Sequence, residues 1–532
     1  MGKVNLLDCT LRDGGYVNEW NFEHSITVCM FNRLVDTNVE MIEVGLLDDR
    51  EEFNINRTIQ PTTKCYDEIF KYCNKKNSLV FAMIDYGTCK IENIAECNET
   101  FLDGIRVIFK KTNAKKAIEF GKQLIEKGYK VCFQLVSITS YEDRDILDFV
   151  DEVNKIDTFC VSIVDTYGLL HNDDLLHYYQ LLDYNLKQSI ILGYHAHNNF
   201  QLAYSNCIDV IKNNTSREIV IDGTVYGMGK SAGNAPLELL AMFLNKTCKK
   251  NYDINQILEI IDTNILKIYN KKYWGYNLLY YLSASNDCHP NYVNYLLSKK
   301  TLSVKSINDV LKNIPGKNKL DYENKIIKDL YEEYQKNIGC KETDLSNLFD
   351  NIKDRNILVL GPGKSMIENE TDIKNYIKEN NPIIFSVNFI PEKIKFNYLF
   401  ISNSKRYNIM FNNYDILNNT AKVIATSNIT SISKPFDYIL NYEKLLDNEE
   451  IICDNSLIML LNAFVLLNIS SVTLAGLDGF SPVGISSYYN EYLELSTDYD
   501  RLEVINIKIK ERLLEMREKI DISFLTQSLY NN

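Results

Sequence analysis

Two short motifs carry side chains that could act together on a substrate. Arg12 and Asp13 are adjacent in the segment 8–15, and a single residue separates His195 from His197. Side chains two apart in an extended segment face the same way, so both imidazoles can reach one cation. With Asp13 as a third ligand, a divalent ion would keep open positions for substrate and water. The sequence therefore predicts a site for Mn²⁺, Mg²⁺ or Zn²⁺, although a His-x-His at a strand end also occurs without a metal.

The element before Arg12 and Asp13 explains where they should lie. Residues 4–7 include a short apolar run typical of a buried parallel strand, and Gly14 and Gly15 end regular structure directly after the pair. Arg12 and Asp13 are therefore expected at the carboxyl end of a strand. A charged pair in that place is either a structural salt bridge or part of an active-site rim.

Short apolar strands alternate with helical stretches up to about residue 245, which is the pattern of a parallel α/β fold. An example of a helical stretch is 114–127, whose apolar residues share one face. Eight such units fit a closed (β/α)8 barrel, and a doubly wound open sheet is the alternative. The eight predicted strands are 4–8, 41–44, 79–83, 104–107, 131–135, 159–164, 190–195 and 219–222.

Several of these strands end in polar residues, which a closed barrel would bring to one mouth and an open sheet would spread along an edge. We expect Glu43 and Gln134 to bind substrate there. The loop after the last strand, 222–238, has glycines that allow close approach to a small ligand. In it, Asn234 is either a further oxygen ligand that contacts substrate or the cap of a helix starting at Ala235.

The rest of the chain predicts two further parts. Residues 251–350 read as a helical extension and linker after a first domain at 1–250, and the aromatic-rich stretch 273–297 within them suggests a packing face or lid. A second, Rossmann-like α/β domain is expected at 351–532. Its predicted strands are 357–360, 383–387, 398–401, 422–425 and 471–474.

The first strand of this second domain runs into a glycine-rich turn. Gly361, Gly363 and Ser365 could present backbone N–H groups to a phosphate at a helix N-terminus. Leu358 stands where the P-loop pattern requires its first glycine, so this is not a Walker motif. A tight strand-to-helix turn without a ligand is the alternative interpretation.

Composition excludes several classes of function. The chain has 532 residues, and its net charge of −13 makes nucleic acid an unexpected partner. No apolar run approaches the ~20 residues needed to cross a membrane. The first strand begins so early that a signal peptide is not expected, and a cytoplasmic location follows. The 13 cysteines are scattered without a Cys-x-x-Cys, so no zinc ribbon is indicated.

Three separated motifs together resemble the DRE-TIM metallolyase superfamily over about residues 1–300. They are Asp8-x-Thr-Leu-Arg-Asp-Gly14, His195-x-His-Asn198 and Gly227-x-Gly-x-x-x-Gly-Asn-Ala-Pro-x-Glu238. The resemblance implies a divalent metal held by Asp13, His195 and His197, with Arg12 stabilising an enolate next to a 2-oxo acid. The substrates implied are a 2-oxo acid and an aldehyde, as in the 4-hydroxy-2-oxovalerate aldolases of that superfamily.

The chain departs from these relatives at one catalytic position. The aldolases carry a histidine three residues after the metal aspartate, where this chain has Tyr16. We assign Tyr16 a catalytic role, although an unperturbed phenol is a poor base at neutral pH. The lyases of the superfamily place a cysteine in the late glycine loop, and 224–227 has none. The alternatives are a Claisen-type acyl-CoA synthase of the same superfamily and a non-catalytic metal-binding scaffold.

The second domain is faintly similar to nucleotide-binding domains of the sialyltransferase or pterin-pyrophosphokinase type. That similarity implies a nucleotide or nucleotide sugar as a partner, and a protein that joins a three-carbon oxo-acid unit to a sugar-derived aldehyde. We also expect a homo-oligomer.

Overall fold

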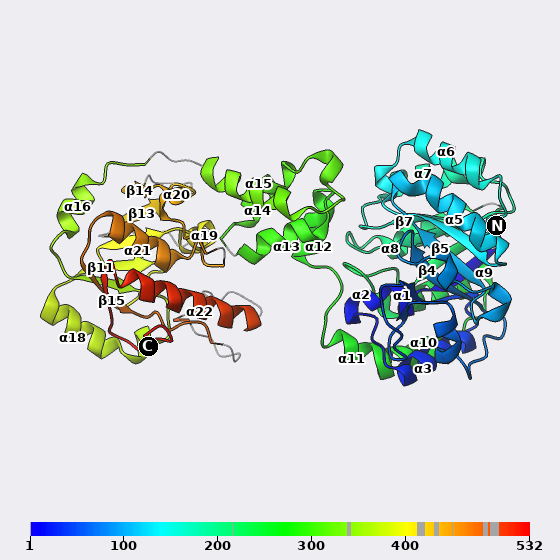
Figure 1. Ribbon diagram of the computed structural model, residues 1–532, viewed down its shortest axis with the longest axis horizontal. Coiled ribbons are helices and arrows are strands. Elements are labelled where there is room, and N and C mark those ends of the chain that lie inside the picture. Colours follow the sequence, from blue (N-terminus) through cyan, green and yellow to red (C-terminus); the bar gives the residue numbers. More distant parts are fainter. Residues whose placement is uncertain are drawn as a thin grey trace. The chain divides into compact units, whose positions relative to one another are not determined.

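The computed structural model describes residues 2–214, 216–299, 301–337, 342–411, 421–429, 436–449, 451–481, 488–489 and 499–531. They fall into two compact units, which Figure 1 colours by sequence. Unit 1 is Met1–Pro290 with Lys319–Asp321, and unit 2 is Asn291–Asn318 with Tyr322–Asn532. The expected extension at 251–350 is thus divided between the units. Its first part belongs to unit 1 because Trp274 is buried in that unit's core.

Unit 1 is a closed, all-parallel barrel of eight strands. The chain closes it at β1, which pairs with β2 on one side and with β9 on the other. The fold class expected from the sequence is therefore confirmed, and the open sheet is excluded. The strands are β1 (Val4–Asp8), β2 (Met41–Leu47), β4 (Leu79–Asp85), β5 (Gly104–Ile108), β6 (Lys130–Leu135), β7 (Cys160–Asp165), β8 (Ile191–Ala196) and β9 (Ile219–Gly223), with the unexpected two-residue β3 (Ile59–Gln60) paired to β2.

Helices surround the barrel, as Figure 1 shows for α5 to α9. In α5 the residues Ala117, Ile118, Gly121 and Leu124 form the buried face, which is the amphipathic pattern expected from the sequence. The helices of unit 1 are α1 (Thr10–Asp13), α2 (Gly15–Asn18), α3 (His24–Asp36), α4 (Lys64–Ile69), α5 (Ala114–Glu126), α6 (Asp143–Val153), α7 (Asn172–Asn185), α8 (Ala203–Asn213), α9 (Leu237–Cys248), α10 (Ile254–Ile260), α11 (Leu266–Tyr269) and α12 (Leu278–Ser285).

Strand alternation separates the barrel's apolar floor from its polar mouth. Met41 on β2, Cys132 on β6 and Val220 on β9 belong to an apolar cluster inside the barrel. Two residues further along each strand the side chain points to the same side, so it lies inside and nearer the carboxyl end. The residues at these next inward positions are Glu43, Gln134 and Asp222. The alternation of residues along these strands therefore places apolar side chains at the base of the barrel interior and polar or charged side chains at its mouth.

Unit 2 contains a second, all-parallel sheet of seven strands. Their order is β14-β13-β12-β11-β10-β15-β16, so a second α/β unit is confirmed. Five strands agree closely with expectation: β10 (Ile357–Leu360), β11 (Ile383–Val387), β12 (Tyr398–Ile401), β13 (Lys422–Thr426) and β15 (Ser471–Ala475). Two were not expected, β14 (Tyr438–Leu440) and β16 (Asp521–Phe524).

The helices of this unit follow the same α/β alternation after an initial helical segment. They are α13 (Pro290–Lys299), α14 (Val304–Lys312), α15 (Asn324–Asn337), α16 (Ser346–Ile352), α17 (Ser365–Glu368), α18 (Glu370–Asn380), α19 (Ser404–Phe411), α20 (Tyr442–Leu445), α21 (Ser456–Leu466) and α22 (Tyr499–Met516). Among the described residues of the whole chain, no helix is both long and apolar enough to span a bilayer.

One buried arginine ties the strand β9 to the end of α7. Arg217 is 1% exposed and forms an ion pair with the Asp183 carboxylate. It also donates hydrogen bonds to four backbone carbonyls, those of Asp183, Leu186, Lys187 and Ile190. It thereby satisfies carbonyls that follow the last turn of the helix.

We predict that Arg217→Met lowers the free energy of unfolding by about 3 kcal/mol, because several buried carbonyls lose their donor at once. Chemical denaturation monitored by circular dichroism measures it. The matched control is Arg144→Met, which removes an exposed pair with Asp148 and should cost at most ~0.5 kcal/mol. Equal losses of unfolding free energy for the two substitutions would contradict a stabilising role for the Arg217 hydrogen bonds.

Candidate metal centre

Six buried side chains form a closed ring of charges and hydrogen bonds at the barrel mouth. Each is at most 5% exposed and pairs with the next one around the ring. In order they are Arg12, Glu43, Arg106, Asp222, His195 and Asp13. Residues from both ends of the barrel sequence therefore meet at one place, as the sequence analysis expected for Asp13 and His195.

The arginines alternate with carboxylates in this ring. Arg12 Nε lies 2.7 Å from Glu43 Oε2, and its Nη1 lies 2.6 Å from Asp13 Oδ2. Arg106 Nη1 lies 3.1 Å from the same Glu43 oxygen, and its Nη2 pairs with Asp222. Every buried charge thus has an opposite charge beside it, which offsets the cost of removing it from water. The Arg12–Asp13 pair is a buried salt bridge, and it lies in the same ring as the candidate ligand His195.

Local structure fixes Arg12 and Asp13 in this arrangement. They lie in the single turn of α1, directly after β1, and not on the strand itself. The Asp8 carboxylate accepts hydrogen bonds from the backbone N–H and the hydroxyl of Thr10, which holds the start of that turn. The Trp20 indole donates to the Arg12 carbonyl at 2.9 Å.

Asp13, His195 and His197 offer three ligand atoms within 4.8 Å of one another. His195 Nδ1 lies 2.9 Å from Asp222 Oδ2, so this nitrogen carries the proton and Nε2 faces Asp13 at 3.3 Å. His197 Nδ1 lies 3.2 Å from the Lys230 carbonyl, which only accepts, so its Nε2 keeps the free lone pair. In histidines that bind metals, a carboxylate or a carbonyl commonly accepts from the nitrogen that does not bind the ion, and both imidazoles have such a partner here.

The charge states of Asp13 and His197 suit a cation, whereas a cation would have to replace a proton on His195. Burial alone would raise the pKa of Asp13, but the Arg12 charge and the His195 hydrogen bond hold it well below its usual value. Burial lowers the pKa of His197 to about 3, so this imidazole is neutral at physiological pH. Burial also opposes a charge on His195, yet hydrogen bonds to Asp13 and Asp222 raise its pKa.

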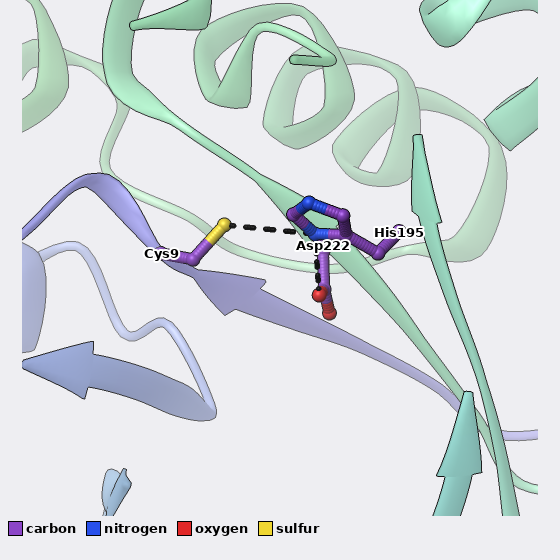
Figure 2. A group of neighbouring side chains, drawn as sticks. All are labelled: Cys9, His195 and Asp222. Atoms are coloured by element: carbon purple, nitrogen blue, oxygen red, sulfur yellow. Dashed lines mark hydrogen bonds and ion pairs between the residues drawn. The ribbon is translucent and has the colours of Figure 1, made fainter. Parts of the chain in front are cut away.

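A second group around His195 could also be taken for a metal site. Figure 2 shows Cys9, at the end of β1, and Asp222, on β9, both directed at the Nδ1 side of the His195 ring. Burial raises the pKa of the Cys9 thiol well above its usual value, and the thiol donates to the Gly223 carbonyl. A protonated thiol is a poor ligand. We therefore interpret this group as the support that orients His195.

Unpaired polar atoms in the mouth fit a bound ion and substrate. Both side-chain polar atoms of Asn234 and the Nε2 of Gln134 are buried and have no hydrogen-bond partner among the described residues. Asn234 does not cap the next helix: α9 starts at Leu237 and has no side-chain cap, so that interpretation is wrong. Buried polar groups are rarely left unpaired, and an oxygen beside His197 suits a hard cation or its substrate.

Tyr16 lies at the outer side of the same mouth. Its ring packs edge-on against Trp20, with centroids 4.8 Å apart, and the residue is 39% exposed. Burial of its hydroxyl raises the pKa of Tyr16 to about 12, although Arg12 opposes the shift. The phenol therefore stays protonated at neutral pH, which makes it a hydrogen-bond donor and not a base.

The sequence analysis assigned no role to Arg106 or Asp222. Their roles depend on which strands face each other across the barrel, since β5 and β9 are not neighbours in the sheet. Both inward positions follow from strand alternation, which is the signal that could have found them. Glu43, expected to bind substrate, bridges Arg12 and Arg106 and keeps one unpaired oxygen, Oε1.

In unit 2 the predicted phosphate turn is occupied by the protein's own groups. The Gly361 and Gly363 N–H groups donate to the carbonyls of Ala475 and Gly476, and the Ser365 N–H donates to the Asp478 carboxylate at 2.7 Å. A phosphate at this turn would have to displace a carboxylate, so these contacts favour a structural turn. Nucleotide binding there stays a prediction.

The barrel region is similar in sequence to a known protein family. The family model described as HMGL-like matches residues 3–263, and the N-terminal part of the chain is accordingly an HMGL-like domain of the DRE-TIM type. An oxaloacetate decarboxylase of Mycobacterium tuberculosis is 24% identical over 45% of this chain and 70% of its own length. The 4-hydroxy-2-oxovalerate aldolase of a Marinomonas species is 24% identical over 50% of this chain and 77% of its own.

One solved structure is similar over the same region. The N-terminal domain of a candidate aldolase from Bacteroides vulgatus is 26% identical, with a TM-score of 0.48, and the match covers 57% of this chain and 98% of that one.

We predict that Asp222→Asn lowers the affinity for Mn²⁺ about 10- to 100-fold, because the amide no longer fixes the His195 ring with its lone pair toward the site. Calorimetric titration of the protein with Mn²⁺ measures this, and circular dichroism checks the fold. Asp209→Asn on the outer helix α8 changes a carboxylate that accepts an exposed hydrogen bond from Asn172, so it is the matched control. If Asp222→Asn leaves the Mn²⁺ affinity unchanged, the Asp222 carboxylate does not orient His195 as a metal ligand.

Proposed function

Because residues 3–263 form an HMGL-like domain, we propose that this protein is a divalent-metal-dependent carbon–carbon lyase or aldolase acting next to a 2-oxo acid. The observation that carries the proposal is the buried triad of Asp13, His195 and His197 beside the Arg12 guanidinium. Exclusion of water from such a cluster strengthens its action on charge that develops during a reaction.

The two relatives are named for different reactions, but both reactions include the same chemical step. Aldol cleavage of a 4-hydroxy-2-oxo acid and decarboxylation of oxaloacetate both break a bond to C3 of a 2-oxo acid. In each case the electron pair remains on the 2-oxo acid fragment as an enolate, which then takes a proton from water. The fragment that leaves is carbon dioxide in the decarboxylation and an aldehyde in the aldol cleavage, where the C4 hydroxyl proton passes to water. We propose this step for the present chain, with the aldehyde-forming reaction as the first candidate.

The residues take separate roles in that step. A divalent ion, when bound, would supply charge stabilisation at the oxygens of the 2-oxo acid. Arg12 adds a fixed positive group at the same place, and Glu43 holds its guanidinium in position through Nε. Asn234 and Gln134 offer unpaired polar atoms to the substrate. Tyr16, which keeps its proton, donates a hydrogen bond at the outer end of the pocket.

Enolate formation should be visible without the second substrate. We expect the protein with Mg²⁺ to exchange the methyl protons of pyruvate in deuterium oxide, measured by ¹H NMR. His195→Ala and a chelator should each abolish the exchange, since they remove a ligand or the ion. His177→Ala, at an exposed position paired with Asp143, is the control and should exchange normally. If no proton exchange is seen with several 2-oxo acids, in the presence of either Mn²⁺ or Mg²⁺, the proposal is wrong.

The role of Tyr16 has its own test. Tyr16→Phe should lower kcat for cleavage of a 4-hydroxy-2-oxo acid about 100-fold, as expected for the loss of one donor to a charged transition state. The size of the loss should be the same at pH 7 and pH 9, because a phenol with a pKa of about 12 is protonated at both. The control is Tyr184→Phe, at a residue that is 82% exposed. A loss that grows with pH would indicate a base instead of a donor.

A further inference from the structure

The side chain of Lys230 has an unusual environment at the barrel mouth. It lies in the loop after β9, and its Nζ sits 5.3 Å from the centre of the Tyr16 ring. Among the described residues, the ammonium contacts this ring and forms no ion pair with a carboxylate. The charges of Asp13 and Asp85 reach it, but Asp13 is already engaged by Arg12 and His195.

The backbone of Lys230 fixes where this cation points. Its N–H donates to Asp13 Oδ1 at 2.8 Å, and its carbonyl accepts from His197 Nδ1 at 3.2 Å. Lys230 is therefore anchored to two of the three candidate ligands. The ligands are buried, whereas Lys230 is half-buried and Tyr16 is exposed, so the ammonium lies on the solvent side of the triad.

The charges of the ring leave the Lys230 ammonium without a counterion of its own. Two arginines face three carboxylates in the ring, so a divalent ion and the carboxylate of a 2-oxo acid would together bring its formal charge to zero. The ammonium of Lys230 would remain, and the charge of Asp85 reaches it from outside the ring. No ion pair joins these two side chains among the described residues, and a half-buried cation without a direct partner is unfavourable.

We infer that Lys230 is a specificity-determining residue that pairs with a second anionic group of the substrate, a carboxylate or a phosphate, distal to the 2-oxo acid end. This inference rests on the proposed function, because the 2-oxo acid end must occupy the triad for its other end to reach Lys230. The preferred substrates are accordingly dianions, in which the fragment that leaves carries its own negative charge.

A matched pair of ligands tests the inference directly. The ligand 2-oxoglutarate and the ligand 2-oxopentanoate have the same 2-oxo acid end and chain length, but only the first ends in a carboxylate. We expect the full-length protein with Mn²⁺ to bind 2-oxoglutarate at least about tenfold more tightly by calorimetry. A third ligand, 2-oxo-4-phosphonobutanoate, distinguishes a phosphate-like preference from a carboxylate preference.

Substitutions then assign this preference to Lys230. Lys230→Met should reduce the ratio of the two affinities to about one, and Lys230→Arg should keep most of it. The control is Lys110→Met, at a lysine whose charge is already paired with Asp321 at 2.7 Å, and it should keep the wild-type ratio.

The outcomes separate this inference from the proposed function. If the wild-type protein binds both ligands equally, or if Lys230→Met keeps the ratio, the inference is overturned while 2-oxo acid binding stands. If neither ligand binds in the presence of Mn²⁺ or Mg²⁺, the proposed function fails and this inference fails with it.

Discussion

The ring of six buried side chains is the constraint on which the rest of unit 1 depends. Burying an ionised group is costly, and the cost is tolerable only because each arginine lies between two carboxylates. Such a network is stable only as a whole, since the loss of one member leaves another charge unpaired in a dry interior. His195 connects this network to the candidate metal centre, because Asp222 holds one ring nitrogen and leaves the other facing Asp13.

Closure of the barrel is what makes the ring possible. Asp13 follows the first barrel strand and His195 lies on β8, the seventh of the eight. The pairing of β1 with both β2 and β9 brings the beginning of the barrel next to its end. Alternation along the strands then sets apolar side chains at the base and charged ones at the mouth. The loop after β9 completes the mouth by joining Lys230 to Asp13 and His197.

The sequence predicted the barrel strands to within a few residues, because short apolar runs and flanking glycines are local signals. It also predicted that Asp13, His195 and His197 lie together, because residues at the carboxyl ends of strands meet at one mouth of a closed barrel. Strand alternation directs both Arg106 and Asp222 inward, but their ion pair could not be predicted, because it spans the barrel and depends on strand register. The pKa of Tyr16 and the unpaired amide of Asn234 depend on burial, which composition and spacing do not specify. In unit 2 a glycine turn that resembled a phosphate site is filled by Asp478, a residue distant in sequence.

The proposed chemistry depends on one ion held by Asp13, His195 and His197. The most direct measurement is an anomalous difference map at the manganese absorption edge, from a crystal grown with Mn²⁺ and oxalate. We predict a single strong peak bounded by the Asp13 carboxylate and the Nε2 atoms of both histidines, with oxalate on its open side. A map in which that position is empty while Mn²⁺ is bound elsewhere, or in which the ion sits between Cys9 and Asp222, would contradict it.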